Sequence, residues 1–321
     1  GNNSGSGISI TLDGDENMQP DLVWVKSRDA THAHVLYDSV RTSPAKYLLQ
    51  PNTNVAERTA TIGSFDSNGV TFSDNDGFYN GSGTYVGWFW KESATAGFDI
   101  VSYTGDGSAS TTISHSLSAV PHWIIVKNRS EATSWCVAHK SLSTDKVLRL
   151  ETTDAQGDIG DGELDSPPAS SSNFAFNNGT SGTPLKVVNE SSDNYIAYLW
   201  TAKQGFSKFG SYTGNGNADG AFIYTGFRPA CIIMKCSSDA ATPWLIWDNK
   251  RPGYNVTNLR LRPDTNNAED TSTADPIDLL SNGFKCRGSN DDSNKSGSTY
   301  IYMAFAEAPF VNSSGVPNNA R

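Results

Sequence analysis

The chain has 321 residues, of which 36% are hydrophobic, 18% charged and 11% aromatic, and its formal net charge is −10 at pH 7. This length suits about two or three domains of ordinary size, and the aromatic content excludes a disordered chain. An acidic chain without an apolar run of 18 residues is not expected to bind nucleic acid or to insert into a membrane. Because it starts at Gly1 with no methionine or signal peptide, we expect it to be part of a longer polypeptide.

The first segment that predicts a strand is PDLVWVKSRD at 20–29. Its apolar residues do not alternate with polar ones, which predicts a strand covered on both faces. A second block, HVLYDSVR, follows at 34–41, and a third, GTYVGWFWKE, at 83–92. Shorter strands are predicted between them at 46–49 and 69–72, where turn signals separate β-branched and aromatic residues.

The same three blocks return twice, in the same order. The copies are PHWIIVKNRS (121–130) and PACIIMKCSS (229–238), CVAHKSLS (136–143) and LIWDNKRP (245–252), and DNYIAYLWTA (193–202) and STYIYMAFAE (298–307). Equivalent blocks lie about 100–110 residues apart, a period too long for a solenoid or a propeller blade. The aligned lysines and tyrosines are Lys26, Lys127 and Lys235, and Tyr85, Tyr195 and Tyr300. The pattern therefore predicts three copies of one module.

We predict an all-β chain of three tandem, homologous β-sandwich modules of the jelly-roll or lectin-like kind. The expected modules span residues 1–96, 97–205 and 206–321, and each holds about six to eight short strands separated by turns. Further short strands are expected at 147–150, 259–261 and 283–286. Only three short segments, 54–60, 144–150 and 266–272, could hold a helical turn.

Two modules begin with nearly the same phrase, SYTGDGSAS at 102–110 and SYTGNGNAD at 211–219. We interpret each as the end of a first strand that runs into a hairpin turn, where glycine supplies positive φ. In the first module, GISITLDGDEN at 7–17 takes the place of this phrase. A phosphate-binding loop is not favoured, because strand-like residues follow the phrase rather than a helix.

Metal and cofactor sites are not predicted. The stretch SFDSNGVTF at 64–72 has one residue too many for the Asp-box of sialidases, and a turn between two strands explains it better. His32 and His34 are two apart but lack a third ligand, so a solvated strand edge is favoured over a zinc site. Acidic clusters at 13–17, 74–77 and 291–292 could hold a loop Ca²⁺, but none has the spacing of a dedicated calcium loop.

No catalytic group is predicted either. Asp38, His139 and Asp248 occupy equivalent places in three separate modules, so structural hydrogen bonds are favoured over a triad. Four cysteines could pair in three ways, but scattered core thiols are favoured over disulfides. Cys231 and Cys236 in particular would face opposite sides of one strand.

Several of these blocks resemble modules of uncharacterised phage structural proteins, which are common in marine phages and are often labelled tail-fibre proteins. The resembling segments are Pro20–Arg28, Tyr37–Arg41, Ser207–Gly220, Ile277–Lys285 and Thr299–Phe310. The resemblance covers nearly the whole chain. It implies a virion protein, made in the host cytoplasm, that contacts other virion proteins. The middle copy departs most, because YDSVR at 37–41 becomes AHKSL at 138–142.

The sequence therefore favours a non-enzymatic virion protein, the distal part of a tail fibre that binds host-surface polysaccharide. One alternative is a capsid decoration protein or head fibre with the same modules. A second is a glycan-degrading tailspike enzyme, although such enzymes usually carry long β-helical tracts with short repeats.

Loop aromatics are the candidate glycan-binding residues: Phe78 and Tyr79 in one loop, and Arg251, Tyr254 and Asn255 in another. Their rings can cover the apolar faces of a sugar while polar neighbours hold its hydroxyl groups. The alternative is that these rings fold inward and plug the end of a sandwich. One such site would bind weakly, and a homotrimer would raise the avidity.

Overall fold

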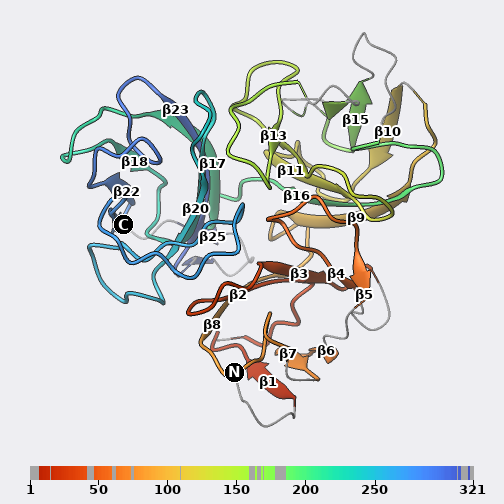
Figure 1. Ribbon diagram of the computed structural model, residues 1–321, viewed down its shortest axis with the longest axis horizontal. Coiled ribbons are helices and arrows are strands. Elements are labelled where there is room, and N and C mark those ends of the chain that lie inside the picture. Colours follow the sequence, from red (N-terminus) through yellow and green to blue (C-terminus); the bar gives the residue numbers. More distant parts are fainter. Residues whose placement is uncertain are drawn as a thin grey trace.

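The computed structural model contains β-strands and irregular segments but no helix in the residues that it describes (Figure 1). These residues are 7–14, 16–41, 47–59, 63–73, 76–108, 110–158, 163–164, 168, 170–177, 186–308, 310–311 and 317–318. The all-β fold class is confirmed, and the described residues of the three segments that could hold a helical turn form none. Over the same ranges, no helix could span a membrane.

The strands fall into three groups in chain order, which we call the first, second and third units. The first unit holds β1 (Ile8–Thr11), β2 (Leu22–Ser27), β3 (Val35–Asp38), β4 (Tyr47–Leu48), β5 (Arg58–Thr59), β6 (Gly63–Asp66), β7 (Gly69–Phe72) and β8 (Tyr85–Trp90). Its inner sheet has the order β3-β2-β8 and its outer sheet the order β1-β7-β6, while β4 and β5 form a short ribbon.

The second unit repeats this plan with a wider inner sheet. It holds β9 (Phe98–Thr104), β10 (Ser110–Ser114), β11 (Trp123–Asn128), β12 (Cys136–His139), β13 (Leu148–Arg149), β14 (Glu163–Leu164), β15 (Asn173–Asn177) and β16 (Asn194–Trp200). The inner order is β13-β12-β11-β16-β9 and the outer order is β10-β15-β14. The first and last strands therefore pair in one layer, and the second and penultimate strands pair in the other, as in a chain rolled across two sheets.

The third unit has the same two layers. It holds β17 (Ser207–Thr213), β18 (Phe222–Tyr224), β19 (Pro229–Cys236), β20 (Trp244–Asp248), β21 (Ile277–Leu280), β22 (Gly283–Cys286) and β23 (Thr299–Ala306), and the pair β24 (Phe310–Val311) and β25 (Pro317–Asn318) follows. The orders are β17-β23-β19-β20 and β18-β22-β21. The segment 259–261 forms isolated bridges rather than the predicted strand. The expected boundaries fall between β8 and β9 and between β16 and β17.

The central strands of the inner sheets are buried on both faces, as the unbroken apolar runs predicted. Every residue of β2 and of β11 is buried. On one face, Val23 and Val25 pack against the outer sheet of their own unit. On the other, Leu22 and Trp24 enter a central core to which all three units contribute. Strict alternation is absent from the sequence because neither face meets water.

The three units surround this central core as a closed ring (Figure 1). Three residues at equivalent positions near the ends of β8, β16 and β23 meet in this core; they pair with Leu22, Trp123 and Cys231 of the neighbouring strands. The ring of Trp90 lies 6.1 Å from that of Trp200 and 5.9 Å from that of Phe305, both edge to face. Aromatic residues from all three units therefore share one core.

A loop of each unit hydrogen-bonds to the next unit, and this closes the ring. The backbone N–H of Glu57 donates to the carbonyl of Arg129 (3.1 Å) and that of Gln156 donates to Ser237 (2.8 Å). The third bond, from Glu269 to Arg28 (2.7 Å), returns from the third unit to the first. These are three equivalent pairs, since Arg28, Arg129 and Ser237 each lie two residues after an aligned lysine.

The aligned lysines are fully buried beside backbone carbonyl groups. The Nζ of Lys26 donates to Ala30 (3.1 Å) and that of Lys127 to Thr133 (2.9 Å), while Lys235 donates to the carbonyl of Cys236 (2.8 Å). Burial lowers the pKa of each ammonium group to about 8. Each lysine therefore holds the turn that ends its strand.

The aligned tyrosines fix the segment that leads into the last strand of each unit. The hydroxyl of Tyr195 accepts from the N–H of Glu190 (2.7 Å) and donates to the carbonyl of Lys186 (3.0 Å). Tyr300 makes the same pair of bonds to Lys295 and Asp291, and Tyr85 makes them to Gly81 and Gly77. The repeated tyrosine is therefore structural.

Two predictions about the first unit are wrong. His34 is buried, not solvated, and its Nδ1 accepts from Trp24 Nε1 (3.0 Å). The segment 7–17 does not replace the Tyr-Thr-Gly phrase, because β1 pairs with β7 as β10 pairs with β15 and β18 with β22. It corresponds to the strand after that phrase. The prediction of free thiols is confirmed: all four cysteines are buried and unpaired.

Candidate functional site

Arg251 is not available to a ligand, which corrects its assignment as a glycan-binding residue. Its side chain is only 2% exposed and its Nε donates to Asp248 (2.7 Å). Its NH1 contacts Glu269 (2.8 Å), and its NH2 donates to the carbonyl of Ile246 (3.0 Å). Glu269 also binds Arg28 of the first unit (2.8 Å). Arg251 therefore belongs to the junction between the third and first units.

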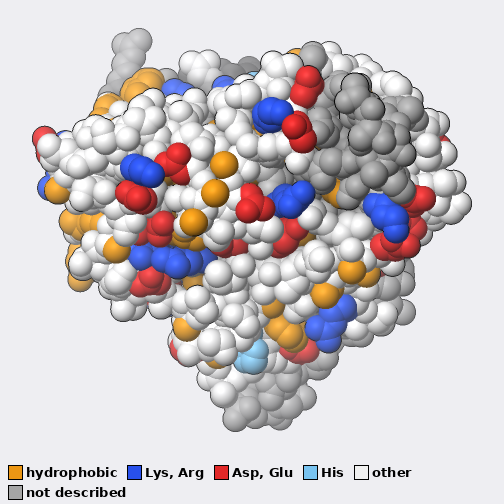
Figure 2. Space-filling model, turned by 45° about the horizontal axis from the view of Figure 1, so that its top comes forward, with side chains coloured by type: hydrophobic (Ala, Val, Ile, Leu, Met, Phe, Trp, Pro, Cys, Tyr) orange, Lys and Arg blue, Asp and Glu red, His pale blue; other side chains and the backbone are white. Residues whose placement is uncertain are grey.

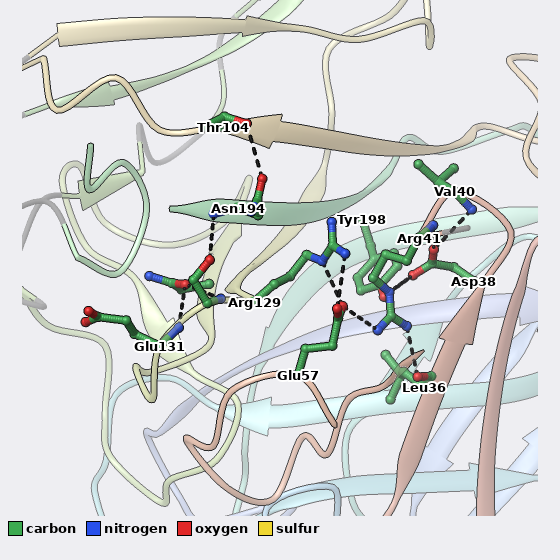
Figure 3. A network of polar contacts seen from close by, with 12 residues as sticks. Leu36, Asp38, Val40, Arg41, Glu57, Thr104, Arg129, Glu131, Asn194 and Tyr198 are labelled. Carbon is green, nitrogen blue, oxygen red and sulfur yellow. Dashed lines mark hydrogen bonds and ion pairs between the residues drawn. The ribbon is translucent and has the colours of Figure 1, made fainter. Parts of the chain in front are cut away.

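The first unit repeats this arrangement at Arg41 (Figure 3). Arg41 Nε donates to Asp38 (2.5 Å), and its NH1 lies 3.3 Å from Glu57. Glu57 in turn binds Arg129 of the second unit (2.7 Å), and Asp38 accepts from the hydroxyl of Tyr198 (2.7 Å). The spacing of Asp and Arg in YDSVR and WDNKR, three residues in each, was the sequence signal for this shared structural role.

The loop after Arg251 does present one aromatic ring. Tyr254 is 78% exposed, and it lies between two fixed points of the loop. Arg251 anchors one end, while Asn255 anchors the other by bonding β21: its Nδ2 donates to the carbonyl of Leu279 (3.0 Å) and its Oδ1 accepts from the N–H of the same residue (2.9 Å). Of the predicted residues, Tyr254 is thus the one placed for contact, and Asn255 positions it.

Phe78 and Tyr79 turn inward and do not form a surface. Tyr79 is 2% exposed, stacks on Phe72 at 5.1 Å and meets Tyr37 edge to face at 5.7 Å. Phe78 is half-buried and packs on the ring of His32 at 5.6 Å. These rings plug one end of the first unit, the alternative that the sequence left open.

Two exposed aromatic residues were missed by the sequence analysis. Phe222 and Tyr224 are 47% and 54% exposed and lie on β18, at the edge of the outer sheet of the third unit. Between them, Ile223 faces the core, so both rings lie on the outer side of the sheet. The alternation Phe-Ile-Tyr was a signal, but all three residue types also suit a doubly buried strand.

Exposed large hydrophobic residues gather in the third unit. Among the described residues they are Val55, Phe222, Tyr224, Tyr254 and Val256, of which only Val55 lies elsewhere. We call the last four the aromatic surface. Figure 2 shows hydrophobic side chains along its left edge, the side on which the third unit lies in Figure 1. Tyr254 is tied to β21 and Phe222 lies on β18, so roughly two strand spacings, about 10 Å, separate their strands.

Charged groups border the aromatic surface. The ammonium group of Lys208 lies 4.9 Å from the ring centre of Tyr224 and donates to its carbonyl (2.8 Å). Lys285 binds Asp219 (2.5 Å), and this hydrogen bond, with the attraction between the two charges, lowers the pKa of Asp219. Rings flanked by solvated donors and acceptors can bind a sugar by stacking on its C–H face and bonding its hydroxyls.

The equivalent positions of the other units carry small hydroxyl residues. In the first unit, Ile10 pairs with Val70 as Ile223 pairs with Phe284. Ser9 and Thr11 therefore occupy the positions equivalent to Phe222 and Tyr224. In the second unit, Ile113 pairs with Phe174, and Thr112 and Ser114 take those positions. All four are exposed. The aromatic surface is therefore a property of the third unit and not of the shared fold.

A pair of carboxyl groups was the remaining candidate for acid–base chemistry. Burial raises the pKa of Glu92 to about 7, and a hydrogen bond from its protonated carboxyl to Asp99 and the charge of Asp99 act in the same direction. Asp99 is 3% exposed and accepts from the N–H groups of Ile100 and Ser116. Glycosidases separate their carboxyl groups by about 5 Å or more to admit a sugar, whereas these two groups bond each other. Asp38 and Asp248 accept from Arg41 and Arg251, and His139 Nδ1 accepts from the N–H of Ser141. Within the described residues, no cluster of three metal-binding side chains occurs.

Comparison with known proteins gives one family. A family model described as a domain of unknown function (DUF7483) matches residues 2–309. No curated protein and no solved structure matches the chain.

Proposed function

This chain belongs to the DUF7483 family, and we propose that it is a non-catalytic binding protein of a phage particle. In this proposal it forms the distal part of a tail fibre and attaches to host-surface polysaccharide through the aromatic surface of its third unit. The phage assignment rests on the resemblance of its repeated blocks to phage structural proteins.

The observation that carries the binding proposal is the contrast between equivalent strands. Phe222 and Tyr224 replace small hydroxyl residues that the same fold accepts in two other units. The fold therefore does not need rings there, and exposing them to water is unfavourable unless they meet a ligand. Tyr254, on a loop anchored at both ends, adds a third ring at low entropic cost of ordering.

Carbohydrate suits this surface better than an apolar protein partner. Charged groups border the rings, and two of them, Lys208 and Asp219, already bond Tyr224 and Lys285. A single shallow site of this kind binds sugars at about 0.1–1 mM. Repetition of the site in a homotrimer would raise the avidity by roughly 10²–10⁴.

The test is a glycan array probed with the labelled chain and with the double variant Phe222→Thr, Tyr224→Ser, which installs the side chains of the second unit. We expect the variant to lose at least about tenfold in affinity, since it loses two stacking rings. Val55→Thr, which removes an exposed apolar group outside the aromatic surface, serves as the matched control. Equal binding by the double variant would contradict the assignment of this surface.

Two further measurements separate the rival functions. Antibody labelling of virions by electron microscopy distinguishes a tail fibre from a capsid decoration protein or head fibre. Incubation with a bound polysaccharide, followed by assay of new reducing ends, distinguishes a binding protein from a depolymerase. Sustained release of reducing ends would overturn the non-catalytic part of the proposal.

A further inference from the structure

The inner sheet of the first unit ends at β8, whereas the equivalent strands of the other units are paired on both sides. In the second unit β16 lies between β11 and β9, and in the third unit β23 lies between β19 and β17. Among the described residues, β8 pairs with β2 alone. Only Trp88 and Trp90 of its six residues are buried, whereas six of the seven residues of β16 are.

On the side of β8 away from β2, the backbone N–H and C=O groups are placed to pair with another antiparallel strand. Trp90 and Thr84 direct their carbonyls to Asp21 (2.7 Å) and Arg28 (2.8 Å), on the β2 side. In an antiparallel sheet, alternate residues face opposite neighbours, so Tyr85, Gly87 and Phe89 direct their N–H and C=O groups away from β2. An unpaired edge of this kind is a template for another strand.

The paired units show what an added strand would contribute. In the second unit Tyr103 of β9 stacks on Tyr195 with 5.0 Å between ring centres. In the third unit Tyr212 of β17 stacks on Tyr300, also at 5.0 Å. Tyr85 is their counterpart, and no described ring stacks on it. The strands β9 and β17 both carry Ser-Tyr-Thr-Gly at this point.

Cavities lie on both sides of the β8 edge. One of about 430 Å³ is lined by Val86, Trp88 and Trp90 together with Phe305 of the third unit. Another, of about 190 Å³, is lined by Ile10, Phe72, Tyr85, Phe89 and other residues of the first unit. Side chains of a strand alternate between the two faces of a sheet, so an added strand would fill both spaces.

We propose that the β8 edge accepts an antiparallel strand from a partner polypeptide, with the pattern of β17: an aromatic or aliphatic residue opposite Trp88, and Ser-Tyr-Thr opposite 86–84. Backbone bonds to Tyr85, Gly87 and Phe89 would supply affinity, and the tyrosine ring stacked on Tyr85 would supply specificity.

Charge and position favour this occupant over others. In the register of β17 the position of Lys208 lies opposite Phe89, and the chain as a whole is acidic, with a net charge of −10. A strand with the Lys208 of β17 therefore complements the chain better than one with the Asp99 of β9. The larger cavity is lined by residues of both the first and the third units, so a bound strand would extend an interface already present within the chain.

The probe is a fluorescein-labelled peptide with the sequence of residues 205–215, GFSKFGSYTGN, titrated with the intact chain and followed by anisotropy. In the third unit, Gly214 donates to Ser298, and Ala306 donates to Phe206, so the even-numbered amides of β17 face its neighbour. N-methylation at Gly210 should therefore reduce affinity at least about tenfold, whereas N-methylation at Ser211 should change it less than about twofold.

Two protein variants locate the binding to β8. Phe89→Lys places a charge at the edge and should abolish peptide binding, whereas Val55→Lys makes the same charge change elsewhere and should retain it. Thermal unfolding of both variants shows whether Phe89→Lys is folded. If it is not, the pair of methylated peptides on the unaltered chain decides the question alone.

Three results would overturn the proposal: no peptide binding at solubility-limited concentrations, equal binding by the two methylated peptides, or equal binding by folded Phe89→Lys. Light scattering of the chain alone tests another occupant, a second copy. A concentration-dependent dimer that disappears in Phe89→Lys would mean that two β8 edges pair with each other. The occupant of the edge would then be a second copy of this chain and not a strand from a partner polypeptide.

Discussion

The junction between the first and second units is charged, and the equivalent junction between the second and third units is not. The charged set is Asp38, Arg41, Glu57 and Arg129. The corresponding positions of the next junction hold His139, Leu142, Gln156 and Ser237. There Leu142 lies in the central apolar core and His139 is fully buried.

Both junctions nevertheless keep the same backbone bond. Glu57 donates to Arg129 at 3.1 Å, and Gln156 donates to Ser237 at 2.8 Å. His139 also reproduces one bond of the aspartate that it replaces, since its Nδ1 accepts from the N–H of Ser141 (3.0 Å) as Asp38 accepts from Val40 (3.1 Å). The comparison teaches that the ring is closed by backbone bonds and apolar burial, which two different side-chain sets can accompany.

Removing a single charge from the charged junction should have the largest effect. Arg41→Ala leaves the buried Asp38 without its ionic partner, although Arg129 still binds Glu57, and breaking a buried pair in this way costs about 3–5 kcal/mol. Urea denaturation measures the free energy of unfolding. A loss below about 1 kcal/mol would show that water or neighbouring groups replace the guanidinium.

Arg251→Ala is the matched control in the third unit. It has the equivalent two acidic partners, and Arg28 binds Glu269 as Arg129 binds Glu57. Its cost should therefore be similar to that of Arg41→Ala in the same titration, and a much smaller cost would show that only the first of the two junctions depends on its arginine.

The neutral junction should be the acid-sensitive one. Burial lowers the pKa of His139 from 6.5 to about 3, so the unfolded chain binds a proton here before the folded chain does. Stability is therefore lost as the pH falls from about 6.5 towards 3, by about 2 kcal/mol between pH 7 and 5 from this residue. Asp264, whose pKa is raised by burial to about 6, acts in the opposite direction.

The difference in the pH dependence of the free energy of unfolding between the parent chain and His139→Asn isolates the contribution of this histidine. The contributions of the other titrating groups cancel, and asparagine can still accept the hydrogen bond from Ser141. The variant should lose less stability than the parent chain between pH 7 and 5. Parallel pH profiles would mean that His139 is protonated without unfolding.

Replacing the whole charged set should have the smallest effect. The variant Asp38→His, Arg41→Leu, Glu57→Gln, Arg129→Ser copies the neutral junction and leaves no buried charge unpaired. Coordinated removal of buried ion pairs is often neutral, so we expect a change within about 1–2 kcal/mol, well below that of Arg41→Ala alone. A larger loss in denaturant titration would assign the charges a net stabilising role.

Much of the local structure followed from the sequence. The unbroken run at 22–25 predicted a strand buried on both faces, and the repeat predicted that Lys26 and Tyr85 would have counterparts. What could not be predicted is which surface covers the second face of that strand. Periodicity reports burial but not the covering partner, so the shared central core was not anticipated.

The same limit explains the errors in the site. Arg251 was judged from its place in a polar loop, whereas its environment is set by Glu269 and by Arg28 of another unit. Phe222 was not considered, because a single sequence does not show which face of a short strand meets solvent. Tyr254 was placed correctly by its proline- and glycine-bounded loop, where no pattern predicts burial.

The ring closure fixes the number of repeats. In a solenoid each repeat contacts only its neighbours, so gene duplication can lengthen the array one unit at a time. Here the loop of the third unit bonds Arg28 of the first, and Trp90, Trp200 and Phe305 meet at the centre. A fourth copy inserted in tandem would have to open this ring, and a lost copy would leave two tryptophan-rich faces in water. Closure of the ring therefore opposes the gain or loss of a single copy, a constraint that a solenoid does not have.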